Sequence, residues 1–318
     1  MGKFIVKILI ILAITIVVIL VKIITSNVNY LKKNNFRNLP LNNVSNSPCF
    51  KAKIDHLVSS QNFKNCTFLI AGSSMSLNNV SGRIICNRTN EDVYNISSWE
   101  FKPKQLNQFL KIINIDSIKY LLVAFNNWDF GELGFKIDYK ATDSYINGNN
   151  LKRYWCIINK FNYNTFSQDL ANRNKFSEIN NAYESLNFDK YGSILFDHVG
   201  FVISKKRWDA YKDTLGFHLF YNDINDLDFI CNKHKITLIL VYLPNRPNLL
   251  TLKNIIQNKN VSDALRRRFA KSFIDLQNTN IPQNQFCDGT HLFKDGAERV
   301  TNLIIDSLSG KKQLCPIN

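Results

Sequence analysis

Three short apolar runs set the fold that this chain can adopt. They are CTFLIAG at 66–72, IKYLLVAF at 118–125 and ITLILVYLP at 236–244. Each is too short for a buried helix and is followed by turn-forming residues, so we interpret each as a strand. Their apolar residues are continuous rather than alternating, which is typical of strands covered on both faces of a parallel sheet.

Stretches with apolar residues at helical spacing alternate with these runs. We expect helices at 102–114, 221–235, 262–273 and 294–310, and a second strand region at 83–97. Alternating strands and helices predict an α/β fold in which three layers, α/β/α, enclose a mostly parallel sheet. Residues 136–220 interrupt this alternation, and we interpret them as an insertion or a lid.

The N-terminal residues form the longest apolar stretch. Residues 4–25 are apolar except for Lys7 and Lys22, and about 20 apolar residues suffice for a helix to cross a bilayer. We therefore expect one transmembrane anchor at 1–25, then a polar stalk at 26–60 and a folded domain at 61–318. A cleaved signal peptide is the alternative. A single N-terminal anchor favours a single-pass membrane protein with an extracytoplasmic domain, although lysines flank the anchor on both sides.

The net charge of the chain indicates which classes of molecule it can bind. A net charge of +15 attracts polyanions, whether acidic glycan, anionic lipid or nucleic acid. The sequence contains no zinc-finger spacing and no aromatic RNA-binding motif, so nucleic acid is not the expected partner. Its seven cysteines form no C-x-x-C pair, and the histidines lack metal-ligand spacing. We therefore expect no metal and no other cofactor.

Polar residues follow two of the apolar runs, and a third polar group precedes the last expected helix. Ser74 comes just after Gly72 at the end of the first run, and Asn126 follows the second run. Asp288 and His291 lie in the sequence CDGTHLFKDG. Because ligands of open α/β sheets bind at the carboxyl ends of strands, we expect these groups to meet there.

These residue types suit nucleophilic catalysis. A serine, a histidine and an aspartate can act as nucleophile, general base and orienting group of the base, and an asparagine amide can donate to an oxyanion. Each group also has a plain structural interpretation, as a helix cap, an asparagine turn or a loop aspartate. The three groups together are far more specific than any one of them.

Together the motifs resemble those of the SGNH/GDSL hydrolase superfamily. The Gly-Asp-Ser block of the family corresponds to 72–74, with serine in place of aspartate, as in its membrane-anchored cell-envelope branch. Its Gly-x-Asn-Asp block corresponds to 124–127, where the asparagine is kept, and its Asp-x-x-His block corresponds to 288–291. The glycine of its second block has no clean match, and Ser97 or Ser98 would stand in for it.

The resemblance implies serine-dependent acyl transfer, with Ser74 as nucleophile, His291 as general base and Asp288 as its orienting group. It implies an oxyanion hole made by Ser74, Asn126 and Ser97. The substrate would be an envelope or surface glycan, and a membrane-bound acyltransferase would be a partner, by similarity to D-alanyl-lipoteichoic acid biosynthesis and alginate O-acetylation proteins. The alternative is a catalytically silent scaffold or glycan-binding subunit on the same fold.

Overall fold

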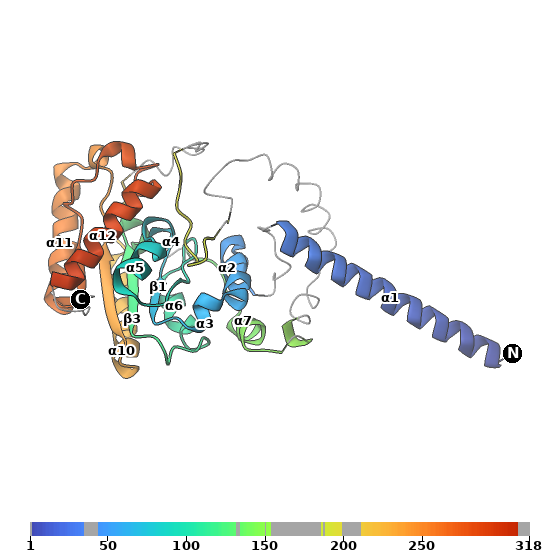
Figure 1. The fold of residues 1–318 in the computed structure, drawn as a ribbon. Coiled ribbons are helices and arrows are strands. Elements are labelled where there is room, and N and C mark those ends of the chain that lie inside the picture. Colours follow the sequence, from blue (N-terminus) through green and yellow to red (C-terminus); the bar gives the residue numbers. More distant parts are fainter. Residues whose placement is uncertain are drawn as a thin grey trace.

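A computed structural model gives the fold of the chain (Figure 1). It describes residues 2–34, 44–131, 134–149, 151–153, 186, 188–198 and 211–310. The α-helices are α1 Gly2–Asn34, α2 Pro48–Ser59, α3 Gln61–Lys64, α4 Ser74–Asn79, α5 Gly82–Thr89, α6 Pro103–Phe109, α7 Tyr139–Ile146, α10 Phe217–Lys233, α11 Leu252–Phe269 and α12 Lys294–Gly310. The strands are β1 Phe68–Ala71, β2 Val93–Asn95, β3 Tyr120–Phe125, β4 Thr237–Tyr242 and β5 Phe273–Asp275. Short 3₁₀-helices are η1 Asn127–Phe130, η3 Pro247–Leu249 and η4 Gln283–Gln285.

The described strands form one five-stranded sheet in the order β2-β1-β3-β4-β5. Every neighbouring pair is parallel; Ala71 at the end of β1, for example, lies opposite Val123 of β3. All the strands therefore point their carboxyl ends to the same edge. This confirms the predicted α/β class and the strands expected at 66–72, 118–125 and 236–244.

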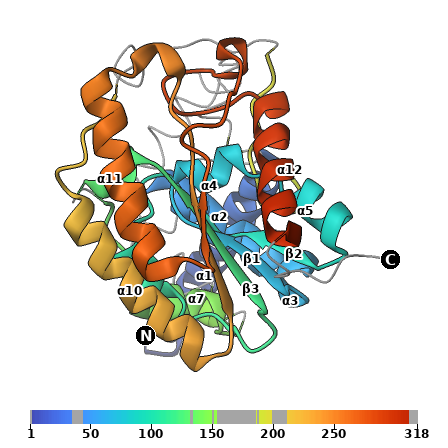
Figure 2. The ribbon, with the colours of Figure 1, turned by 90° about the vertical axis from the view of Figure 1, so that its left-hand side faces the viewer.

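Helices cover both faces of the sheet. In β3, Leu121 and Val123 belong to the apolar cluster shared with α2, α6, α10 and α11, whereas Leu122 and Ala124 belong to the cluster shared with α5 and α12. Successive side chains of a strand point to opposite faces, so the continuous apolar runs serve both clusters. Figure 2 shows α10 and α11 on one side of the sheet and α5 and α12 on the other.

Part of the strand region expected at 83–97 is helical instead. The sequence RIICN lies in α5, and only Val93–Asn95 forms a strand. The Ser81 hydroxyl accepts a hydrogen bond from the N–H of Ile84 at the start of α5, and Asn90 adopts the left-handed conformation, with φ 55°, at its end. These two caps favour a helix over the β propensity of two adjacent isoleucines.

Helix α2 lies in the stretch that we expected to be a polar stalk, 26–60. Ser47 caps its N-terminus by accepting a hydrogen bond from the N–H of Phe50. Phe50 and Ile54 are completely buried and belong to the core cluster that includes β3. The folded part of the chain therefore begins before residue 61, because α2 is buried over most of its first two turns, from Cys49 to Ile54, and again at Leu57.

Helix α1 covers the apolar N-terminal run, and its described side chains from Ile5 to Val21 are exposed. Among the residues that the structure describes, no helix meets the length and hydropathy needed to cross a membrane. The anchor expected at 1–25 stays a prediction.

The insertion expected at 136–220 is described only in pieces. Residues 154–185 and 199–210 lie outside the described residues. Helix α7 and the segment 188–198 are described, and the second of these packs against the carboxyl edge of the sheet: the Ile194 N–H donates to the Leu77 carbonyl of α4. This segment therefore belongs to the surroundings of the site described next.

Candidate active site

The turn after β1 places Ser74 at the carboxyl edge of the sheet. Gly72 has φ 132°, a conformation that only glycine adopts readily. A side chain at Gly72 would also meet its neighbours, because an added Cβ would lie 2.8 Å from Ser76 Oγ. Ser73 then caps α4, its hydroxyl accepting from the N–H of Met75 at 3.2 Å. Ser74 is the first residue of α4, so its N–H has no acceptor within the helix.

Ser76 fixes this turn to the neighbouring strand. Its buried hydroxyl lies 2.7 Å from the Ala71 carbonyl oxygen and 2.9 Å from both the carbonyl oxygen and the amide nitrogen of Ala124. The hydroxyl thus bridges the ends of β1 and β3. The backbone that carries Ser74 is held in place relative to the backbone that leads to Asn126.

The loop before α12 carries His291 and Asp288. Asp288 Oδ2 lies 2.7 Å from Nδ1 of the His291 ring. Its other oxygen, Oδ1, accepts hydrogen bonds from the backbone N–H groups of Thr290 and His291, each at 2.7 Å. Asp288 is completely buried and His291 is 5% exposed. The pair is therefore shielded from water, which strengthens its electrostatic interaction.

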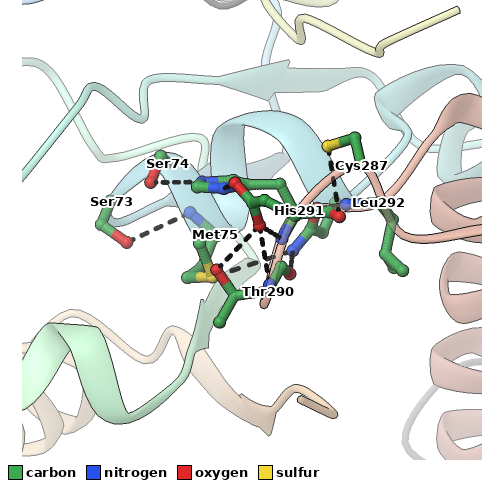
Figure 3. Close-up of polar contacts among 9 residues, drawn as sticks. Ser73, Ser74, Met75, Cys287, Thr290, His291 and Leu292 are labelled. Carbon is green, nitrogen blue, oxygen red and sulfur yellow. Dashed lines mark hydrogen bonds and ion pairs between the residues drawn. The ribbon is translucent and has the colours of Figure 1, made fainter. Parts of the chain in front are cut away.

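Ser74 and His291 meet across the gap between α4 and this loop. Ser74 Oγ lies 2.9 Å from Nε2 of His291, and Figure 3 shows the two side chains pointing toward one another. A carboxylate can only accept, so the Asp288 contact keeps the proton on Nδ1 of His291. Nε2 is then the acceptor for the Ser74 hydroxyl proton. The structure thus brings together the three side chains that the sequence singled out.

Asn126 follows β3 at the same edge of the sheet and carries an unused hydrogen-bond donor. Its Oδ1 accepts from the N–H of Trp128 at 2.9 Å, which leaves Nδ2 as the free end of the amide. Nδ2 is buried and has no hydrogen-bond partner among the described residues. An unpaired buried donor costs about 1–3 kcal/mol of stability, so this amide is a candidate donor to a bound ligand.

Asp129 is a part of this edge that the sequence analysis missed. Its Oδ2 accepts from the backbone N–H of Asn126 at 3.0 Å and closes η1 as a capping box. Burial raises the pKa of the Asp129 carboxyl, while Lys102 and a hydrogen bond from the Ser73 hydroxyl oppose that rise. Asp129 therefore links the turn that carries Ser74 to the residue that presents the free amide. Its spacing of three residues from Asn126, within FNNWDF, was the available signal.

Ser97 and Ser98 do not offer the backbone donor that the resemblance led us to expect at their position. The N–H of Ser97 donates to Asn95 Oδ1 at 2.9 Å, and the N–H of Ser98 donates to the Gly72 carbonyl at 3.1 Å. Both N–H groups are therefore used within the fold. What remains at Ser97 is its hydroxyl, which is buried and has no partner among the described residues.

The described residues offer no metal site, and the sequence has no match that would assign a function. In the described parts of the chain, no cluster of histidine, cysteine, aspartate and glutamate could hold a metal ion. No protein-family model and no curated protein matches the sequence.

Proposed function

We propose that the protein transfers an acyl group through Ser74, as an esterase or an O-acyltransferase. The observation that carries this proposal is the continuous hydrogen-bonded chain from Ser74 Oγ through the His291 imidazole to the Asp288 carboxylate. Such a chain activates a hydroxyl that is otherwise a weak nucleophile at neutral pH. Ser74 is partly exposed, whereas the two residues behind it are buried, so a substrate reaches the hydroxyl first.

The reaction would proceed in two halves. Nε2 of His291 takes the proton of Ser74 Oγ as the oxygen attacks the ester carbonyl carbon. The tetrahedral species then expels the alcohol, which takes the proton from Nε2 and leaves an acyl-serine. An acceptor hydroxyl next gives its proton to Nε2 and attacks the acyl carbon, and Ser74 regains its proton when it leaves. Water as acceptor makes the protein an esterase, and a sugar hydroxyl makes it a transferase.

Negative charge develops on the carbonyl oxygen in both halves. The free Nδ2 of Asn126 and the N–H of Ser74 are the donors that we assign to it. The Ser97 hydroxyl is a third candidate donor, in place of a backbone N–H.

The finer assignments rest on the resemblance to the SGNH/GDSL superfamily. The parallel sheet with helices on both faces and the position of Ser74 after β1 support an SGNH-like, flavodoxin-related fold. The exposed apolar side chains of α1 support the membrane anchor, and the net charge of +15 supports an envelope or surface glycan as substrate. We further propose an extracytoplasmic domain and a membrane-bound acyltransferase as partner.

One observation favours the silent scaffold as a second candidate. The backbone N–H groups of Ser97 and Ser98, where the family places an oxyanion donor, are both engaged within the fold. An oxyanion hole with one donor fewer stabilises the transition state less, since a single donor contributes about 10²–10³-fold in kcat. Activity measurements decide between the two candidates.

The test is hydrolysis of p-nitrophenyl acetate by the full chain in detergent. Wild type is compared with Ser74→Ala and with Ser59→Ala, which removes an exposed serine hydroxyl of α2. We expect turnover in wild type and Ser59→Ala and none above background in Ser74→Ala, with an acetyl adduct seen by intact mass only when Ser74 is present. Equal rates in wild type and Ser74→Ala would contradict the proposal.

A further inference from the structure

One buried amide joins the helix of the nucleophile to the loop of the base. Asn79 is the last residue of α4, the helix that Ser74 begins, and its side chain is completely buried. Its Nδ2 donates to the Thr290 carbonyl oxygen at 3.0 Å, and its Oδ1 accepts from the Leu292 N–H at 2.9 Å. The two backbone groups lie on either side of His291.

The orientation of the Asn79 amide follows from its partners. A carbonyl oxygen can only accept and an N–H can only donate, so the NH₂ faces Thr290 and the oxygen faces Leu292. Both ends of the side chain are thus used. A flipped amide would place two acceptors against each other and two donors against each other, so a single arrangement is stable.

Asp288 holds His291 in a different way. The contacts of its carboxylate described above go to Thr290 and His291, which belong to the same loop. These bonds set the orientation of the His291 ring relative to its own loop, but they do not fix the position of that loop relative to α4. Asn79, by contrast, joins the loop to the helix on which Ser74 lies.

We propose that Asn79 is a positioning residue for the base: it keeps Nε2 of His291 within hydrogen-bonding distance of Ser74 Oγ. This inference rests on the proposed function for its consequence in catalysis. Asn79 touches neither substrate nor the reacting atoms; it acts through the backbone of Thr290 and Leu292. Displacement of a reacting group by about 1 Å is enough to lower a rate by about 100-fold.

Asn78 offers a matched control. It is the neighbouring residue on α4, is also buried, and its Nδ2 donates to the Ile194 carbonyl at 2.9 Å rather than to the loop of His291. Asn78→Ala therefore removes a buried asparagine and its hydrogen bond from the same helix. Any loss of activity that follows only from a weakened α4 will occur in both variants.

The first readout needs no turnover. In protein labelled with ¹⁵N-histidine, the chemical shift of Nε2 of His291 reports its hydrogen bond with Ser74, and Ser74→Ala supplies the reference for the broken bond. We expect Asn79→Ala to move this shift toward the Ser74→Ala value and Asn78→Ala to leave it at the wild-type value. A wild-type shift in Asn79→Ala would overturn the inference, whatever the protein catalyses.

The second readout is kinetic and uses p-nitrophenyl acetate. We expect Asn79→Ala to lower kcat by about 10- to 100-fold with little change in KM, and to have almost no further effect in a His291→Ala background. An equal loss in both backgrounds would mean a general structural role and would overturn the inference. If Asn79→Ala does not fold, Asn79→Asp takes its place. This variant keeps the side-chain size and the oxygen that accepts from the Leu292 N–H, but it places a second oxygen against the Thr290 carbonyl oxygen, so that hydrogen bond is lost. We expect the same chemical shift and the same kinetic pattern as for Asn79→Ala.

The two proposals can fail separately. Absence of any Ser74-dependent turnover, together with the expected ¹⁵N shifts, would reject the acyl-transfer function and leave the positioning role of Asn79 intact. Ser74-dependent turnover with unchanged shifts and unchanged kcat in Asn79→Ala would do the reverse.

Discussion

Three N–H groups converge on the carboxylate of Asp288. The backbone N–H groups of Thr290 and His291 donate to Oδ1, and the ring Nδ1 of His291 lies against Oδ2. A carboxylate can serve all three because neither of its oxygens carries a hydrogen. The charge of this side chain thereby fixes which ring nitrogen of His291 holds the proton.

The variant Asp288→Asn tests this arrangement. The two backbone N–H groups will hold the amide oxygen, so the NH₂ will face Nδ1 and force the proton of the ring onto Nε2. His291 then cannot accept a proton from Ser74, and we expect kcat to fall by roughly 10³–10⁴-fold. The measurement is the rate of p-nitrophenyl acetate hydrolysis, with Asp116→Asn as an exposed control. A kcat within about tenfold of wild type would show that this tautomer is not needed.

At this scale the sequence indicated the candidate reacting residues more readily than the residues that support them. Ser74, Asp288 and His291 were found because serine, aspartate and histidine carry recognisable chemistry in recognisable patterns. Asn79 and Asp129 were missed because asparagine and aspartate are frequent in turns, and their roles depend on backbone groups that come close only in the folded chain.

The segments around β1 and β3 form the support of the site. Gly72 turns the chain with φ 132°, and Ser76 bonds the ends of β1 and β3 together. Because the two strands are parallel neighbours, the residues that follow them lie at the same edge of the sheet. This is why Ser74 and Asn126, far apart in sequence, lie at the same edge of the sheet.

Gly72→Ala tests the turn. An added Cβ would lie 2.8 Å from Ser76 Oγ, and alanine at this φ is strained, so we expect a loss of stability of about 1–3 kcal/mol. Gly310→Ala is the matched control, because an added Cβ at Gly310 meets no atom within 4 Å. Urea denaturation measures both. Equal stability of the two variants would contradict the strained turn.

The elements that the sequence predicted correctly are the long apolar ones. The runs at 66–72, 118–125 and 236–244 form strands because they serve both apolar clusters, and the amphipathic stretch at 294–310 forms α12. Short elements were less predictable. Strand β5 begins at Phe273, which we expected to close a helix at 262–273; helix α11 ends at Phe269 instead, and the three residues of β5 are too few for a periodic signal.

Lys53 connects three parts of the molecule in its interior. It lies on α2 and is 1% exposed, and its Nζ donates to the carbonyl oxygens of Asn95, at the end of β2, and of Gly192, in the segment 188–198. The ammonium also lies 3.9 Å from the centre of the Phe188 ring. Burial lowers the pKa of Lys53 from 10.5 to about 7.

This pKa makes the stability of the whole molecule depend on pH. Between about pH 7 and pH 10.5 the folded protein has released the Lys53 proton while the unfolded chain still binds it. The free energy of unfolding therefore rises with pH across this window. Below about pH 7 the folded protein holds Lys53 in its charged form, and the full destabilisation by this buried charge is present. Relative to Lys53→Met, we expect wild type to gain about 2–3 kcal/mol between pH 7 and pH 9.

Urea denaturation at several pH values measures that gain. Lys64→Met, at an exposed position of α3, controls for the loss of a lysine. A difference between wild type and Lys53→Met that stays constant from pH 6 to pH 9 would contradict the buried, neutral lysine. The sequence did not indicate this residue, because α2 lies in the stretch expected to be a stalk.

Labelling with a fluorophosphonate tests whether Ser74 is the nucleophile. The full chain is treated with the probe, and the modified peptide is mapped by mass spectrometry in wild type, Ser73→Ala, Ser74→Ala and His291→Ala. We expect an adduct on Ser74 that persists in Ser73→Ala, disappears in Ser74→Ala and forms far more slowly in His291→Ala. An adduct on a different serine, or no adduct on Ser74 while a reference serine esterase in the same tube is fully labelled, would contradict it.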